Sequence, residues 1–176
     1  MQRLGDNRHK PLFGDAHYLS LANSAGAQGQ VMGVPEQALM PIVAEALHLL
    51  GVKRAMIVHS DGLDEISTMG PTKIMELKAG KIIESMLNAG DYGIKKASLD
   101  DLKGGDAKSN AEAVKNIING KETGARKDIV VLNAAAAIIV AGLAQDFGSA
   151  VRIAGQAISS GEATRRLEKL VMVSKG

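Results

Sequence analysis

One short segment, HSDGLDEIS at positions 59–67, carries the side chains best suited to chemistry. Its three carboxylates, Asp61, Asp64 and Glu65, fall within five residues, and Gly62 permits a tight turn between them. Asp and Glu oxygens suit Mg²⁺, which keeps several waters and completes its shell with substrate phosphates. The segment is therefore a candidate cation site. The spacing alone, however, favours the more ordinary interpretation of a solvated acidic loop.

Three other polar features give weaker chemical signals. His59 ends a predicted strand and could touch a ligand there, but a single histidine at such a place is more often structural. The segment KGGD at 103–106 could offer backbone N–H groups to a phosphate, yet it lacks the spacing of the common phosphate loops and favours a plain turn. Asn133 is better placed to cap a helix than to act in catalysis. No Ser–His–acid arrangement and no HExxH motif can be identified in the sequence.

The elements that must position these residues follow from apolar spacing. The run RAMIVH at 54–59 predicts a strand covered on both faces, and ligands bind beyond the carboxyl ends of such strands. The other expected elements are a strand at 30–34, a helix at 37–50, a hairpin of strands 72–77 and 81–86, a helix from Asn110 to about Gly120, a strand at 128–132, and helices at 134–144, 149–159 and after Gly161.

This order of elements predicts the fold class. Strands that alternate with helices imply right-handed crossovers, so we expect an α/β fold with a mostly parallel sheet flanked by helices. In that arrangement the strands 54–59 and 128–132 lie parallel in one sheet.

Composition limits the classes of protein. Aromatic residues make up only 2% of the 176 residues, which argues against a surface that stacks nucleic-acid bases. The net charge is only +2, and the basic residues are scattered along the sequence. We therefore expect neither a nucleic acid nor a membrane as partner. The absence of cysteine excludes disulfides, thiolate zinc sites and a cysteine nucleophile, and it is consistent with a cytoplasmic location. The most apolar segment, 129–144, is shorter than a membrane span.

Four blocks carry a resemblance to a known family. HSDGLDEIS, GPTKIMEL, ASLDDLKGGDAKSNA and DIVVLNAAAAIIVAGLA resemble, in this order, the C-terminal part of the anthranilate phosphoribosyltransferases. That family transfers a phosphoribosyl group from phosphoribosyl pyrophosphate to the amine of anthranilate in tryptophan biosynthesis. The resemblance implies catalysis by positioning and by Mg²⁺ at the leaving pyrophosphate, without a nucleophile. It also implies that Asp64 and Glu65, the acidic pair of the GLDE motif, contact Mg²⁺.

The resemblance covers residues 23–176, which we expect to form the C-terminal part of the family's α/β domain. Residues 1–22 lack an apolar period and match nothing in the family, so we expect an irregular, weakly held segment. Before Asn23 there is no counterpart to the family's GTGGD pyrophosphate loop, its KHGNR segment or the N-terminal helical domain that makes its homodimer. The segment NSAG at 23–26 stands where the family reads NPAG. We therefore expect a truncated gene product, or half of a split enzyme that needs a complementing N-terminal chain.

Other functions remain open on the sequence alone. The chain could be a non-catalytic remnant that keeps the fold, or a binding module on the same fold. A protein resembling the pyrimidine nucleoside phosphorylases is a further alternative, although the order of the GLDE and NAAAA blocks fits it less well. The sequence does not separate the enzyme from the remnant.

Overall fold

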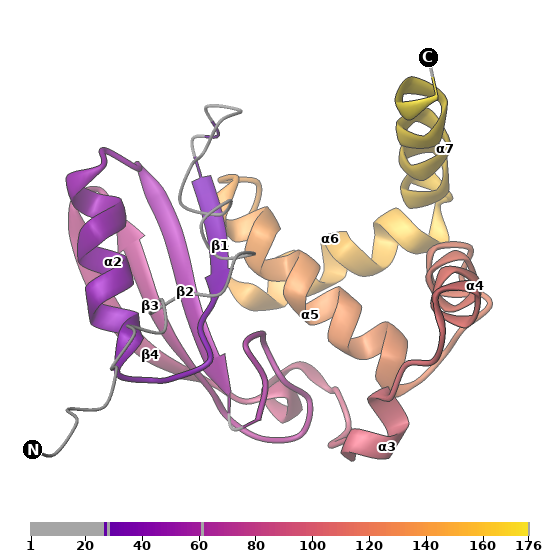
Figure 1. Ribbon diagram of the computed structural model, residues 1–176, viewed down its shortest axis with the longest axis horizontal. Coiled ribbons are helices and arrows are strands. Elements are labelled where there is room, and N and C mark those ends of the chain that lie inside the picture. Colours follow the sequence, from indigo (N-terminus) through magenta and orange to yellow (C-terminus); the bar gives the residue numbers. More distant parts are fainter. Residues whose placement is uncertain (1–26, 28, 61, 176) are drawn as a thin grey trace, which may run out of the picture.

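The computed structural model describes residues 27, 29–60 and 62–175. The expectations for residues 1–22 and the Asp61 carboxylate lie outside these ranges. Four strands form one sheet in the order β1 (Gly29–Gly33), β2 (Arg54–Ser60), β3 (Thr72–Lys78) and β4 (Lys81–Leu87) (Figure 1). The helices are α2 (Leu39–Leu49), α3 (Leu99–Leu102), α4 (Ala107–Ile118), α5 (Ala125–Val140), α6 (Phe147–Ser159) and α7 (Glu162–Ser174), with a short 3₁₀ turn at Ala89–Tyr92.

The sheet confirms the α/β class but corrects the expected strand directions. Strand β1 pairs with β2 in parallel, and the connection between them contains α2. Strands β2, β3 and β4 pair antiparallel, and β3 and β4 form the predicted hairpin around Ala79 and Gly80. Among the described strands only one of the three pairs is therefore parallel, instead of most of them.

The expected strand at 128–132 is wrong, because these residues lie inside helix α5. The buried side chains of α5 recur at helical spacing: Val131, Leu132, Ala135, Ala136, Ile139 and Val140. A short apolar run does not by its period distinguish a buried strand from a buried helix. Here the following alanines, the best helix formers, extend one continuous stripe through both predicted elements.

Helices cover both faces of the sheet, with α2 on one face and α5 and α6 on the other (Figure 1). Strand β2 shows this alternation directly. Ala55 and Ile57 pack in the cluster with α2, whereas Met56 and Val58 pack in the cluster with α5. The core therefore encloses β2 on both sides, as its continuous apolar sequence predicts, and leaves its carboxyl end to carry the next loop.

The remaining helices match their predictions more closely. Helices α2, α6 and α7 lie within a few residues of their expected bounds. Helix α4 begins earlier than expected, because the carboxylate of Asp106 accepts from Ser109 N at 2.7 Å and caps it in place of Asn110. In the part of the chain that the structure describes, no helix is both long enough and apolar enough to cross a bilayer.

Candidate functional site

The acidic loop, described at Ser60 and at residues 62–66, turns back on itself at the end of β2. Ser60 and Leu63 exchange two backbone hydrogen bonds, each 3.0 Å long. Gly62 lies between them with φ at +83°, a conformation that favours glycine. The turn therefore carries Asp64 and Glu65 past the carboxyl end of β2, where both side chains are exposed.

Buried hydroxyl groups fasten this loop to the hairpin. Ser60 Oγ donates to the carbonyl of Glu65 at 2.8 Å and lies 2.8 Å from Thr72 Oγ1. Because the single Ser60 hydroxyl proton is used on Glu65, Thr72 donates to Ser60 Oγ. Thr72 Oγ1 also accepts from Ser67 N at 3.0 Å. One threonine at the start of β3 thus holds both ends of the segment that contains the acidic pair.

The end of β1 packs against the same loop. A Cβ atom at Gly33 would overlap the backbone carbonyl of Asp64, so the close approach of the two chains requires glycine. One residue further on, the carbonyl of Val34 accepts from His59 Nδ1 at 2.9 Å. Because a carbonyl only accepts, Nδ1 carries the ring proton. This contact supports the structural interpretation of His59.

Asn133 joins the loop to helix α5. Its Oδ1 accepts from Ile66 N at 3.0 Å, and its Nδ2 donates to Ile66 O at 2.8 Å and to Ile129 O at 3.0 Å. The expectation that Asn133 caps a helix is therefore wrong, because α5 begins at Ala125 and Asn133 lies in its middle. The sequence signal was an amide inside an otherwise apolar stripe, where it needs a buried partner.

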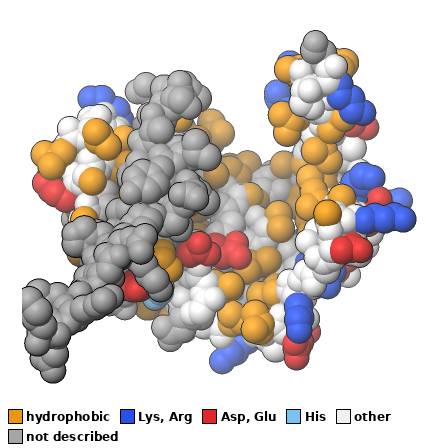
Figure 2. Space-filling view, viewed as in Figure 1, with side chains coloured by type: hydrophobic (Ala, Val, Ile, Leu, Met, Phe, Trp, Pro, Cys, Tyr) orange, Lys and Arg blue, Asp and Glu red, His pale blue; other side chains and the backbone are white. Residues whose placement is uncertain are grey.

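The surroundings of the acidic pair act on the Glu65 carboxyl group. Although Glu65 reaches solvent, nearby protein atoms partly desolvate it and raise the pKa of its carboxyl group, and the charge of Asp64 raises that pKa further. A cation bound between the two groups would relieve this repulsion. Figure 2 shows acidic side chains gathered near the centre of one face, in the region where Figure 1 draws the loop after β2.

The donor chemistry of this pair fits Mg²⁺. Mg²⁺ is usually held by one or two carboxylates, with waters and substrate phosphates as its other ligands. Among the described residues no group of three or more Asp, Glu, His or Cys side chains could hold a metal by itself. The pair therefore suits a cation that arrives with a phosphate substrate, and does not suit a closed structural metal site.

The KGGD segment at 103–106 uses its polar groups internally. Gly105 N donates to Asn110 Oδ1 at 2.8 Å, and Arg126 donates to the carbonyl of Lys103 at 2.9 Å. Asp106 caps α4. These contacts support the plain-turn interpretation.

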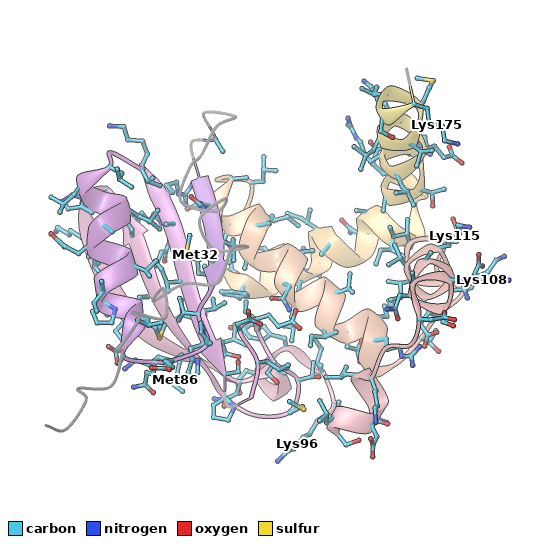
Figure 3. The ribbon with its side chains drawn as sticks, viewed as in Figure 1. Met32, Met86, Lys96, Lys108, Lys115 and Lys175 are labelled. Atoms are coloured by element: carbon cyan, nitrogen blue, oxygen red, sulfur yellow. The ribbon has the colours of Figure 1, made fainter. Side chains whose placement is uncertain are left out.

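The four labelled lysines of Figure 3, Lys96, Lys108, Lys115 and Lys175, project outward from the body of the molecule.

The comparison with known families now defines the class of protein. Residues 19–164 match the model described as "Glycosyl transferase family, a/b domain", so the chain belongs to this family. The sequence is 42% identical over 156 residues to the anthranilate phosphoribosyltransferase of Methanocorpusculum labreanum, covering 89% of this chain and 46% of that protein. The family resemblance predicted from the four sequence blocks is confirmed.

Solved structures agree with this assignment. The anthranilate phosphoribosyltransferase of Thermus thermophilus superposes with a TM-score of 0.75 at 33% identity, over 82% of this chain and 42% of that one. The enzyme of Saccharomyces cerevisiae in complex with PRPP and Mg superposes with a TM-score of 0.73 at 25% identity, over 80% and 41% of the two chains. The chain thus spans less than half the length of the relatives it matches.

Proposed function

We propose that this chain carries the Mg²⁺ side of an anthranilate phosphoribosyltransferase site, with Asp64 and Glu65 as the metal-binding pair. The observation that carries the proposal is the exposure of both carboxylates on a fastened loop at the carboxyl end of β2, where open α/β sheets bind ligands. The yeast relative in complex with PRPP and Mg supports the choice of ligands.

In the proposed reaction the bond from the ribose carbon to pyrophosphate breaks and pyrophosphate leaves with the bonding electrons, while the amine nitrogen of anthranilate bonds to that carbon and then loses a proton to water. When bound, Mg²⁺ supplies charge neutralisation at the departing pyrophosphate. Asp64 and Glu65 orient the cation and its phosphates, and no side chain of the loop acts as a nucleophile. Their role is positioning and electrostatic stabilisation of the transition state.

We further propose that catalysis requires a complementing segment that corresponds to the N-terminal part of the relatives. This segment would supply the GTGGD phosphate loop and the family homodimer contact. Exposed apolar side chains near the end of helix α7 support a covering partner, because contiguous apolar surface marks interaction sites on soluble proteins. They are Leu170, Met172 and Val173, with exposed fractions of 65%, 69% and 66%.

A metal titration tests the proposed role of the acidic pair. Mn²⁺ takes the same oxygen ligands as Mg²⁺ and can be counted through the paramagnetic signal of the free ion. With an N-terminal chain bearing the GTGGD loop added, we expect the chain to bind Mn²⁺ more tightly in the presence of phosphoribosyl pyrophosphate than in its absence. Asp64→Asn and Glu65→Gln should each weaken this binding, by about tenfold or more.

Glu45→Gln is the matched control for these variants. Glu45 is an exposed carboxylate on α2, so its loss changes net charge equally without touching the acidic loop. The proposal fails if the control and the two loop variants bind Mn²⁺ with equal affinity.

A further inference from the structure

The side chain of Asn133 forms hydrogen bonds with backbone groups of two other residues. It forms a matched pair with Ile66, accepting from the N–H and donating to the carbonyl, at 3.0 and 2.8 Å. Its second amide proton goes to Ile129 O, one turn earlier in α5. Asn133 lies 67 positions from Ile66 in the sequence, so this is a tertiary contact that crosses from the helix layer to the acidic loop.

We infer that Asn133 is a positioning residue, which fixes the direction of Asp64 and Glu65 by holding the backbone of the next residue, Ile66. The expected effect on metal binding rests on the proposed function, whereas the hydrogen bonds between Asn133 and Ile66 do not depend on it. Asn133 touches no reacting atom in this account. It acts through the peptide group that follows Glu65.

An amide is the side chain that this contact requires. A carboxylate at position 133 could accept from Ile66 N, but it would then face the carbonyl oxygens of Ile66 and Ile129 with no proton to donate. A leucine of similar size offers neither a donor nor an acceptor. The carboxylate leaves the carbonyl of Ile66 unpaired, and the leucine leaves both its N–H and its carbonyl unpaired, in a place where the Ile66 side chain is fully buried.

The acidic loop would stay attached to the core without the Asn133 amide. A change at Asn133 can therefore alter the orientation of the loop without unfolding the protein. The Ile66 side chain packs in the core cluster with Leu132, Ala135 and Ala136. Ser60 still holds the carbonyl of Glu65 on the other side. Loss of Asn133 should therefore leave the peptide between Glu65 and Ile66 held on its carbonyl side alone, so that it can tilt about that contact while the sheet and helices keep their packing.

The experiment combines two measurements on the full chain. Backbone NMR follows the amide signals of Asp64, Glu65 and Ile66, and a titration follows Mn²⁺ affinity in the presence of phosphoribosyl pyrophosphate and the complementing N-terminal chain. For Asn133→Leu we expect faster hydrogen exchange at Ile66, shifted signals at the acidic pair and Mn²⁺ affinity reduced by about tenfold. Asn133→Ser, whose hydroxyl is too short to reach both groups, should show the same changes and serves if the leucine variant does not fold.

Asp146→Ala is the matched control. Asp146 caps α6 through Ser149, so its loss destabilises the fold without contact to the acidic loop. We expect its Mn²⁺ affinity and the amide signals of Asp64 and Glu65 to match the wild type at temperatures where both proteins are folded. Equal Mn²⁺ affinity for the Asn133 variants and this control, with unshifted loop signals, would overturn the inference.

The two measurements also separate this inference from the proposed function. If the wild type binds no Mn²⁺, the proposed function fails, and the NMR signals alone decide whether Asn133 orients the loop. If the wild type binds Mn²⁺ and the Asn133 variants bind it equally well, the positioning inference fails while the proposed function stands.

Discussion

Gly33, the last residue of β1, lies so close to Asp64 that a Cβ atom at position 33 would overlap the Asp64 carbonyl. The parallel pairing of β1 with β2 brings Gly33 opposite Val58, near the end of the strand from which the acidic loop departs. The position of the candidate metal ligand thus depends on a residue that precedes it by a helix and a strand. A motif search confined to the acidic segment would not find this dependence.

Gly33→Ala should displace the acidic loop and destabilise the fold by about 1–3 kcal/mol, the usual cost of inserting a group into a packed region. Gly70→Ala is the matched control, because a Cβ atom at Gly70 meets nothing within 4 Å and its backbone is not left-handed. Urea unfolding measures the free energy of unfolding of both variants. Similar stabilities of the two variants would contradict the close contact.

Thr72→Val should destabilise the protein by about 1–3 kcal/mol, because it leaves Ser67 N and the Ser60 hydroxyl without their shared partner in a buried place. Thr68→Val provides the same chemical change as a control. The Thr68 hydroxyl is also buried but has no hydrogen-bond partner among the described residues, so its removal should be neutral or stabilising. Thermal unfolding of both variants measures their stabilities and shows whether Thr72→Val loses stability while Thr68→Val does not. A larger loss in Thr68→Val would show that the hydroxyl network is wrongly assigned.

The stability that Asp146 contributes should depend on pH in acid. Hydrogen bonds from the backbone and side chain of Ser149 hold the pKa of Asp146 below its usual value. A lowered folded pKa means that this contribution is complete above the unfolded value, about pH 4, and is lost as pH falls through the folded value. Asp146→Asn keeps a capping side chain that does not titrate.

Urea unfolding of the wild type and Asp146→Asn at a series of pH values measures this effect. The wild type should keep its advantage over the variant above about pH 4 and lose it progressively as the pH falls below that value. A difference that stays constant across this range would contradict the role of the charged cap.

The sequence predicted the elements whose signals are local. The hairpin around Ala79 and Gly80 followed from two apolar runs separated by a turn, and α2 followed from a single stripe. The tight turn at Gly62 was likewise readable, because its positive φ needs glycine.

The sequence failed where partners are distant. Helix α5 was divided into a strand and a helix, because Val130 and Val131 favour strands locally, while the burial of Val131 in a helical stripe depends on packing against α6. The roles of Asn133 and Gly33 were missed for the same reason. Each contacts the backbone of a residue that is remote in sequence, and no spacing rule encodes such a contact.

The most direct test of the account is a steady-state assay with anthranilate, phosphoribosyl pyrophosphate and Mg²⁺. We expect no useful turnover from the purified 176-residue chain, and turnover when an N-terminal chain bearing the GTGGD loop is added. Asp64→Ala should abolish that activity, while Glu45→Ala, an exposed control on α2, should leave it unchanged. Turnover of about 1 s⁻¹ by the chain alone, or complemented activity that survives Asp64→Ala, would contradict the account.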